Sequence, residues 1–336
     1  MQKNSIDYFN KINNFNKIKH VESILVYGKI GLSIPQVTIL IPTYKREDLL
    51  SDTIASALNQ FFYDDYKIIV IDNNPERNCQ TEKLIKTIDN KKILYYKNIT
   101  NIGMFGNWNR GFELSKSEWT VLLHDDDIIS PYFLATCSKF FHNKSIAIIK
   151  PEIIKFSNQL ELNFTNPDNF KLYRYYLLDF IFGCSIGAPT NILYNTSKLI
   201  ASGGFNQDYF PCADYVSSLN IAKDYKVYKL KCILGGYRVS DNESLNGNTM
   251  NLYFAKRVYI SSFIMKFFKI PDYIVSIVQS SWIEHSIRGI NTFYNTKIKY
   301  DYQSNLGLKK LNYIIKNAVY VFCRIFMLIM DLFRRI

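Results

Sequence analysis

The sequence lacks several patterns that would place it in a large class of proteins. Its six cysteines form no C-x-x-C pair and have no histidine nearby at ligand spacing, so we expect reduced thiols and a cytoplasmic protein. The first residues are polar and lack the apolar core of a secretory signal. No uninterrupted apolar run is long enough to span a membrane either.

Two glycine-rich motifs for binding nucleotides are also absent. No G-x-G-x-x-G follows the first predicted strand, which argues against a dinucleotide cofactor. No G-x-x-x-x-G-K-[ST] occurs, which excludes a P-loop enzyme. The sequence therefore predicts neither of these two kinds of nucleotide site.

Acidic residues are outnumbered by basic ones, and the net charge is +12. Such a charge suits nucleic acid, an anionic membrane surface or a phosphate-bearing ligand. The bases are not interleaved with aromatic residues in a recognisable nucleic-acid motif, so no nucleic-acid partner is expected. The excess of bases lies mainly from residue 251 onward.

What the sequence does contain is a folded protein's composition and a regular alternation of strands and helices. Hydrophobic residues make up 48% of the 336 residues and charged residues 21%. Nearly continuous apolar strands that alternate with amphipathic helices predict an α/β fold with a mostly parallel sheet and helices on both faces. The expected strands are 37–41, 67–71, 93–96 and 119–123, and the expected helices are 47–61, 80–88 and 105–114.

Polar residues follow each of these four strands. Because ligands bind at the carboxyl ends of parallel strands, these residues predict one binding site along a single edge of the sheet. Loops are polar in any case, and Asp and Asn favour turns, so the polar residues after any one strand would be weak evidence for a binding site. The sets are 42–46, 72–74, Asn101 with Gly103, and the run His124-Asp125-Asp126-Asp127.

The run of three acids has two interpretations. Acidic runs are usually solvated turns. Adjacent carboxylates also repel one another, and an oxygen-rich cluster of this kind suits Mg²⁺ or Mn²⁺. The three acids alone favour the solvated turn, and the metal site stays open at this point.

The second half of the chain is less regular. After residue 151 we expect a strand at 190–194, a turn at 202–206, a helix from Ala213 to about residue 223, and a strand at 226–230. Asp214 stands near the start of that helix, where a carboxylate can also serve as a cap.

The last part of the chain is predicted to be helical. The segment 252–288 is apolar with scattered bases, and the tail 311–336 is apolar but interrupted by charges. The tail fits either a helix in a membrane interface or a helix packed on the core or a second subunit. We therefore divide the chain into an N-terminal extension with one possible helix (1–36), a main domain (37–245) and a helical C-terminal region (246–336).

The successive motifs of the main domain resemble those of the family 2 glycosyltransferases, in order and spacing as well as in residue type. This resemblance implies a GT-A fold, a nucleotide-sugar donor, a divalent cation (Mn2+ or Mg2+) and inversion at the anomeric carbon. The motifs are Val37 to Arg46, Val70 to Asn74, Asn101 to Gly103, Leu123 to Asp127, Gly203 to Asn206, and Asp214.

The resemblance also assigns roles to individual residues. Asp214 matches the catalytic base, and Asp126, with Asp125 and the weaker candidate Asp127, matches the metal-binding acids. Arg238, with Ser240 and Ser244, matches the segment that closes over the diphosphate. The nucleotide-sugar-binding residues are expected to be Pro42, Thr43, Tyr44, Arg46, Asp72, Asn101, Gly103, Asp125 and Arg238.

Three positions depart from the family pattern. Ala213 replaces an acid before Asp214, His124 stands at the first position of the metal signature, and Ser240 replaces a histidine. These departures leave open a non-catalytic nucleotide-sugar-binding or scaffold protein. The expected function is nevertheless the transfer of a sugar, with a UDP-sugar as the favoured donor, to a surface-glycan or lipid-linked acceptor. We expect the enzyme to be cytoplasmic, either free or bound peripherally to the inner face of the cell membrane.

Overall fold

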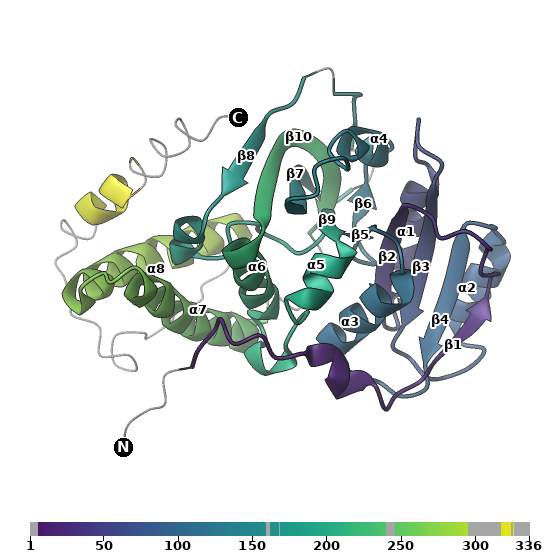
Figure 1. The fold of residues 1–336 in the computed structure, drawn as a ribbon, viewed down its shortest axis with the longest axis horizontal. Coiled ribbons are helices and arrows are strands. Elements are labelled where there is room, and N and C mark those ends of the chain that lie inside the picture. Colours follow the sequence, from purple (N-terminus) through teal and green to yellow (C-terminus); the bar gives the residue numbers. More distant parts are fainter. Residues whose placement is uncertain are drawn as a thin grey trace.

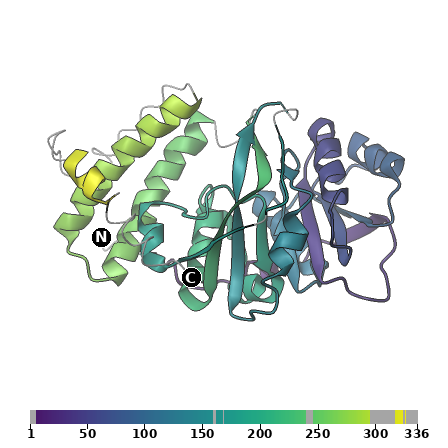
Figure 2. The same ribbon diagram turned by 90° about the horizontal axis from the view of Figure 1, so that it is seen from above.

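One sheet of ten strands organises the part of the chain that the computed structural model describes, namely residues 6–158, 162–167, 169–239, 246–294, 317–323 and 325. Helices cover both faces of this sheet, and a pair of long helices lies at one end of the molecule (Figure 1, Figure 2). The order of strands along the main path is β1-β4-β3-β2-β5-β9-β7-β10-β6, and β8 pairs with β10.

The first half of the chain forms four neighbouring parallel strands, as predicted. The strands are β2 (Val37–Thr43), β3 (Tyr66–Asp72), β4 (Ile93–Asn98) and β5 (Trp119–Leu122), and they lie in the order β4-β3-β2-β5. The helices between them are α1 (Glu47–Leu58), α2 (Gln80–Ile88) and α3 (Met104–Ser115).

The period of two along β2 sends its side chains into two separate cores. Ile39 and Ile41 belong to a cluster that includes residues of α1 and α2, whereas Leu40 belongs to a cluster that includes residues of α3. Gly111 of α3 lies so close to the sheet that an added Cβ would be 2.3 Å from Leu40 Cδ1. The glycine therefore allows α3 to approach β2.

The second half adds antiparallel strands that the sequence did not predict as such. β9 (Ile192–Asn195) runs antiparallel to both β5 and β7 (Ile146–Phe156), while β7 and β10 (Lys226–Arg238) are parallel. The short strands β6 (Ile128–Ile129) and β8 (Leu172–Tyr175) pair with β10 in the antiparallel sense. The helical segments here are α4 (Phe133–Ser138), η3 (Leu177–Phe182), α5 (Thr196–Ala201), η4 (Gln207–Tyr209) and α6 (Ala213–Asp224).

The predicted strand at 226–230 is longer in the structure. It continues through Gly235 and Gly236 to Arg238. A Cβ on Gly235 would lie 2.3 Å from Asn191 Cγ, so this glycine permits a close approach to the segment before β9. The extension brings Arg238 to the end of the sheet where the acidic run lies.

The residues before β2 also take part in the sheet. They form the short 3₁₀ helix η1 (Asn14–Ile18) and the strand β1 (Ser23–Tyr27), which pairs antiparallel with β4. In Figure 1 this purple segment passes from α7 below α6 and α3 to the far edge of the sheet. The division of the chain at residue 36 stays a prediction.

The C-terminal region contains the two long helices α7 (Gly247–Phe267) and α8 (Asp272–Tyr294), in agreement with the helical pattern at 252–288. Most of the predicted tail, 311–336, lies outside the described residues, as do Ser240 and Ser244. Within the described ranges, no helix combines the length and the apolar character needed to cross a membrane.

Candidate active site

The acidic run lies next to the carboxyl end of β2. The backbone N–H of Leu123 donates to the carbonyl of Leu40 at 3.0 Å, so the chain still runs beside β2 after β5 has ended. Thr43, the last residue of β2, is paired with Asp72, the last residue of β3. The register therefore places the predicted polar residues along one edge of the sheet.

Each carboxylate of the acidic triplet, Asp125-Asp126-Asp127, is held by a partner from a different part of the chain. Thr43 Oγ1 donates to Asp125 Oδ2 at 2.7 Å, and Arg46 Nη2 donates to Asp126 Oδ2 at 2.9 Å. Thr43 is the last residue of β2, and Arg46 lies between β2 and α1. The loop and the acidic triplet thus form one connected structure.

Arg238 connects the end of β10 to the same triplet. Its backbone N–H donates to Asp127 Oδ1 at 2.8 Å, and its Nε donates to the backbone carbonyl of Asp126 at 2.8 Å. Its Nη2 forms an ion pair of 3.1 Å with Asp52 on α1. Arg238 consequently holds Asp126 and Asp127 from the end of β10.

Burial shifts the titration of this cluster. Loss of hydration raises the pKa of Asp125 to about 6, although the Thr43 hydroxyl opposes the shift. Burial, followed by the negative charge of Asp126, raises the pKa of Asp127. Burial lowers the pKa of His124 to about 4, which leaves a neutral imidazole at pH 7. A bound cation would stabilise the ionised carboxylates.

The residues present fit a divalent cation. His124, Asp126 and Asp127 each offer one ligand atom, and these atoms lie within 4.8 Å of one another. Among the described residues, His124 Nε2 and Asp127 Oδ2 are buried and have no hydrogen-bond partner. Imidazole and carboxylate groups are both ordinary ligands of divalent metals. Asp125, which was also predicted as a ligand, is instead engaged by Thr43.

Asp72, the predicted reader of the nucleobase, is enclosed in its own polar cluster. Its Oδ2 accepts from Lys97 Nζ and from the Tyr95 hydroxyl, each at 2.7 Å, and its Oδ1 accepts from the N–H of Asn74 at 2.8 Å. The Asp72 side chain is 0% exposed. Contact with a base would require one of these donors to move.

The predicted loop residues Asn101 and Gly103 are tied to the end of β3 by Asn73. Asn73 Nδ2 donates to Asn101 Oδ1 at 2.7 Å and to the carbonyl of Gly103 at 3.2 Å. Of the other predicted residues, Pro42 lies within β2 and is buried, while Tyr44 is exposed beside the cluster. The tyrosine ring is therefore available to a ligand.

Asp214, the predicted base, lies in the first turn of α6. Burial raises its pKa to about 6, and the backbone N–H groups of Tyr215 and of Asp214 itself partly oppose the shift. The position of this carboxylate in the first turn suits a helix cap. Its raised pKa suits a general base. Asp214 raises the pKa of the nearby Cys184 thiol through its charge, after the larger effect of burial.

Lys150 is a buried group of the site that the sequence did not reveal. Its Nζ donates to the carbonyls of Thr190 at 2.5 Å and Ala188 at 3.1 Å, and Thr190 Oγ1 accepts from the N–H of His124 at 3.2 Å. Burial lowers the pKa of Lys150 to about 7, while Asp127 acts in the opposite direction. Lys150 and Thr190 therefore position the start of the acidic run. A lysine within an apolar strand was the available signal.

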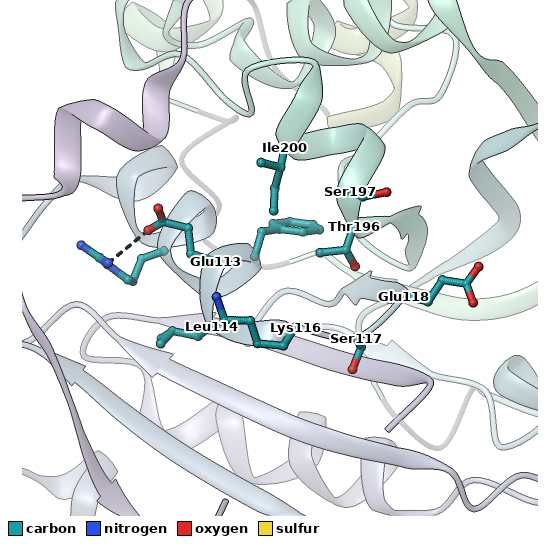
Figure 3. A pocket seen from close by; sticks show the side chains of 10 residues that line it. Glu113, Leu114, Lys116, Ser117, Glu118, Thr196, Ser197 and Ile200 are labelled. Carbon is teal, nitrogen blue, oxygen red and sulfur yellow. Dashed lines mark ion pairs between the residues drawn. The ribbon is translucent and has the colours of Figure 1, made fainter. Parts of the chain in front are cut away.

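A surface pocket lies elsewhere, between the end of α3 and α5 (Figure 3). Its lining includes the ion pair between Arg110 and Glu113, and Ser117 and Glu118 just before β5. Since the acidic triplet follows the carboxyl end of β5, this pocket lies toward the opposite end of the strand. It is not part of the cluster described above.

The sequence of the sheet region is similar to a known family. A model of the family described as Glycosyl transferase family 2 matches residues 38–201. This region of the chain therefore resembles glycosyltransferase family 2. The match begins in β2, extends through the acidic triplet and ends with α5.

The curated relatives that this chain matches are glycosyltransferases by name. It is 24% identical over 297 residues to the poly(ribitol-phosphate) beta-N-acetylglucosaminyltransferase TarP of Staphylococcus aureus, covering 79% of this chain and 84% of TarP. It is 32% identical over 106 residues to the GalNAc(5)-diNAcBac-PP-undecaprenol beta-1,3-glucosyltransferase of Campylobacter jejuni, covering 31% of this chain. That match spans only 33% of the Campylobacter protein.

Solved structures share the fold of this chain. Residues 1–349 of S. aureus TarS in complex with UDP-GlcNAc match with a TM-score of 0.53 at 15% identity, over 69% of this chain and 71% of that fragment. The mannosyltransferase PcManGT from Pyrobaculum calidifontis, in complex with GDP-Man and Mn2+, matches with a TM-score of 0.53 at 11% identity, over 78% and 76%. The predicted GT-A fold with a helical C-terminal region is confirmed.

Proposed function

We propose that this chain is an inverting glycosyltransferase that moves a sugar from a nucleotide-diphosphate donor, a UDP-sugar by preference, to a hydroxyl group of a surface-glycan or lipid-linked acceptor. One observation carries the proposal. The acidic triplet, Arg46, Thr43 and Arg238 meet at the carboxyl edge of the parallel strands in a domain that resembles family 2. The UDP-GlcNAc complex of TarS supports the choice of nucleotide.

The reaction requires a base and stabilisation of the leaving group. In this proposal the Asp214 carboxylate takes the proton of the acceptor hydroxyl, and the acceptor oxygen bonds to the anomeric carbon on the face opposite the donor diphosphate. The bond from that carbon to the diphosphate oxygen breaks, and its electron pair stays on the leaving diphosphate. A divalent cation held by Asp126 and its neighbours would act as a Lewis acid toward the diphosphate.

The charged residues beside the triplet have a binding role in the same scheme. The Arg46 side chain is 35% exposed and carries several donors, so it can leave Asp126 and turn toward a diphosphate. Tyr44 supplies an exposed ring next to it. Asn101 and Gly103 border the donor, and Asp72 reads the base after its donors rearrange.

The acceptor and the location follow from the names of relatives and from the charge. The Campylobacter relative is named for an undecaprenol-linked acceptor, and TarP for a poly(ribitol-phosphate) acceptor. Together with the basic, apolar tail at 311–336, these names support a peripheral position at the inner face of the cell membrane. Deletion of the tail should move the protein from the membrane fraction to the soluble fraction. If the protein with its tail is found in the soluble fraction without detergent, this part of the proposal is wrong.

The function can be tested against the non-catalytic alternative, which Ala213 and Ser240 support. A thermal-shift screen of UDP-, GDP- and dTDP-sugars with and without Mn2+ identifies the donor, and nucleotide release then measures turnover. Asp214→Asn should bind the donor with unchanged affinity and lose turnover by about 10²–10⁴-fold. The matched control is Asp208→Asn, an exposed acid just before α6. Equal turnover by the wild type and Asp214→Asn would refute the enzyme.

A further inference from the structure

The imidazole of His124 is partly buried, with 23% of the side chain exposed. Its ring lies against Trp108, with 5.2 Å between centroids, and its backbone N–H is fixed by Thr190. The Nε2 atom is buried and, among the described residues, has no hydrogen-bond partner. A buried polar atom without a partner is costly unless a ligand satisfies it. Nε2 is therefore the atom of this ring that a ligand can satisfy.

The neighbouring acids are in the same condition. Asp127 is 0% exposed, and its Oδ2 atom also has no hydrogen-bond partner within the described residues. His124 Nδ1 lies 3.8 Å from this oxygen. Among the described residues, Asp126 Oδ2 pairs with Arg46, whose side chain is 35% exposed. Three ligand atoms, one nitrogen and two oxygens, can thus converge on one cation.

Asp125 is not among these three residues and has a partner of its own. Its Oδ2 accepts the hydroxyl of Thr43 at 2.7 Å, in the loop predicted to hold the nucleotide. The three residues that can share a cation are consequently His124, Asp126 and Asp127, rather than three carboxylates.

We propose that His124 is a ligand of the divalent cation and that its nitrogen makes the site select a first-row transition-metal ion, such as Mn2+, over Mg2+. This inference rests on the proposed function, since it concerns the cation of that reaction. Mg²⁺ prefers oxygen ligands and loses water reluctantly, whereas imidazole is a good ligand for transition metals. The histidine at this position therefore favours Mn2+ over Mg2+.

The test measures cation binding directly on the full-length protein. Mn2+ is titrated by electron paramagnetic resonance in the absence of donor, with Mg2+ as competitor, and pulsed measurements detect nitrogen coupling to the bound Mn2+. Wild type should show nitrogen coupling, and Mg2+ should compete only at more than about tenfold excess. His124→Phe keeps an aromatic ring beside Trp108 and should weaken Mn2+ binding at least about tenfold.

Two further variants keep the result interpretable. His124→Asp replaces the nitrogen ligand with an oxygen ligand, so this variant should bind Mn2+ without nitrogen coupling. Its preference for Mn2+ over Mg2+ should be about tenfold lower than that of the wild type. His142→Gln removes an exposed histidine and should behave as the wild type. If nitrogen coupling persists in His124→Asp, or His124→Phe binds Mn2+ as tightly as the wild type, the inference is wrong. Nitrogen coupling in a protein that turns over no sugar nucleotide would uphold the ligand and overturn the proposed function.

Discussion

Lys97 Nζ lies 2.7 Å from Asp72 Oδ2, and both side chains are almost completely buried, at 3% and 0% exposure. The two residues are paired across neighbouring strands, β4 and β3. An ion pair removed from water is stable only while both charges are present. The end of β3, where the donor base is expected, therefore depends on a lysine that comes from the next strand.

Removal of this lysine should destabilise the fold. In Lys97→Met the Asp72 carboxylate would remain buried without its counterion, and we expect a loss of about 3–5 kcal/mol in the free energy of unfolding. Urea unfolding at pH 7 measures it. The control is Lys83→Met, an exposed lysine on α2, which should change the stability by less than about 0.5 kcal/mol. Similar stabilities of the two variants would show that Asp72 finds another partner.

The raised pKa of Asp214 predicts how activity depends on pH. The base accepts a proton only when its carboxylate is ionised, and burial raises its pKa to about 6. For the wild type, kcat/KM should therefore fall about tenfold per pH unit below pH 6 and level off above it. A profile of nucleotide release from pH 4.5 to 8 measures this. A flat profile between pH 5 and 7 contradicts the assignment of Asp214 as the base.

The same shift predicts an effect on stability. A carboxyl whose pKa is higher in the folded state than in the unfolded state destabilises the fold when it is ionised, so its cost grows as the pH rises from about 4 to about 6. Asp214→Asn removes this cost. Its Tm should exceed that of the wild type at pH 8, and the difference should shrink toward pH 4. If the helix-cap role of the carboxylate dominates, the variant has the lower Tm at pH 8.

Arg238 should contribute to stability through its side-chain contacts. Arg238→Met loses the bond from Nε to the Asp126 carbonyl and the ion pair with Asp52, while the backbone bond to Asp127 can persist. We expect a loss of about 2–3 kcal/mol, because a charged, buried donor is removed. Asp52→Asn, at a side chain that is 41% exposed, should cost less than about 1 kcal/mol. Thermal unfolding of both variants compares the two effects.

The strands of the first half could be predicted because each is a short apolar run bounded by polar turns. The same local pattern could not show where β9 pairs, since that pairing joins residues far apart in the sequence. β7 was missed because Pro151 lies inside it, and proline usually argues against a strand interior. The register with β10 shifts soon after Pro151, which accommodates the missing N–H.

For the site, the sequence could place the acids at a strand end but could not show their partners. Arg46 and Thr43 are close to β2 in sequence, and the family resemblance pointed to Arg238. Lys97 could not be recognised because its role depends on the register between β3 and β4. Lys150 could not be recognised because it acts through Thr190, on a loop that the chain reaches only later.

The contact between the N-terminal segment and the turn before α6 has a practical consequence for protein production. Asn14 Nδ2 donates to the carbonyl of Gly203 at 2.9 Å, and Lys17 Nζ forms a 2.7 Å ion pair with Asp208. Gly203 has a φ of +92°, and a Cβ there would lie 2.4 Å from the carbonyl oxygen of Ile12. A shortened protein that starts at residue 37, just before the family match, would lack β1 and these contacts. The limits of the family match are therefore poor limits for cloning.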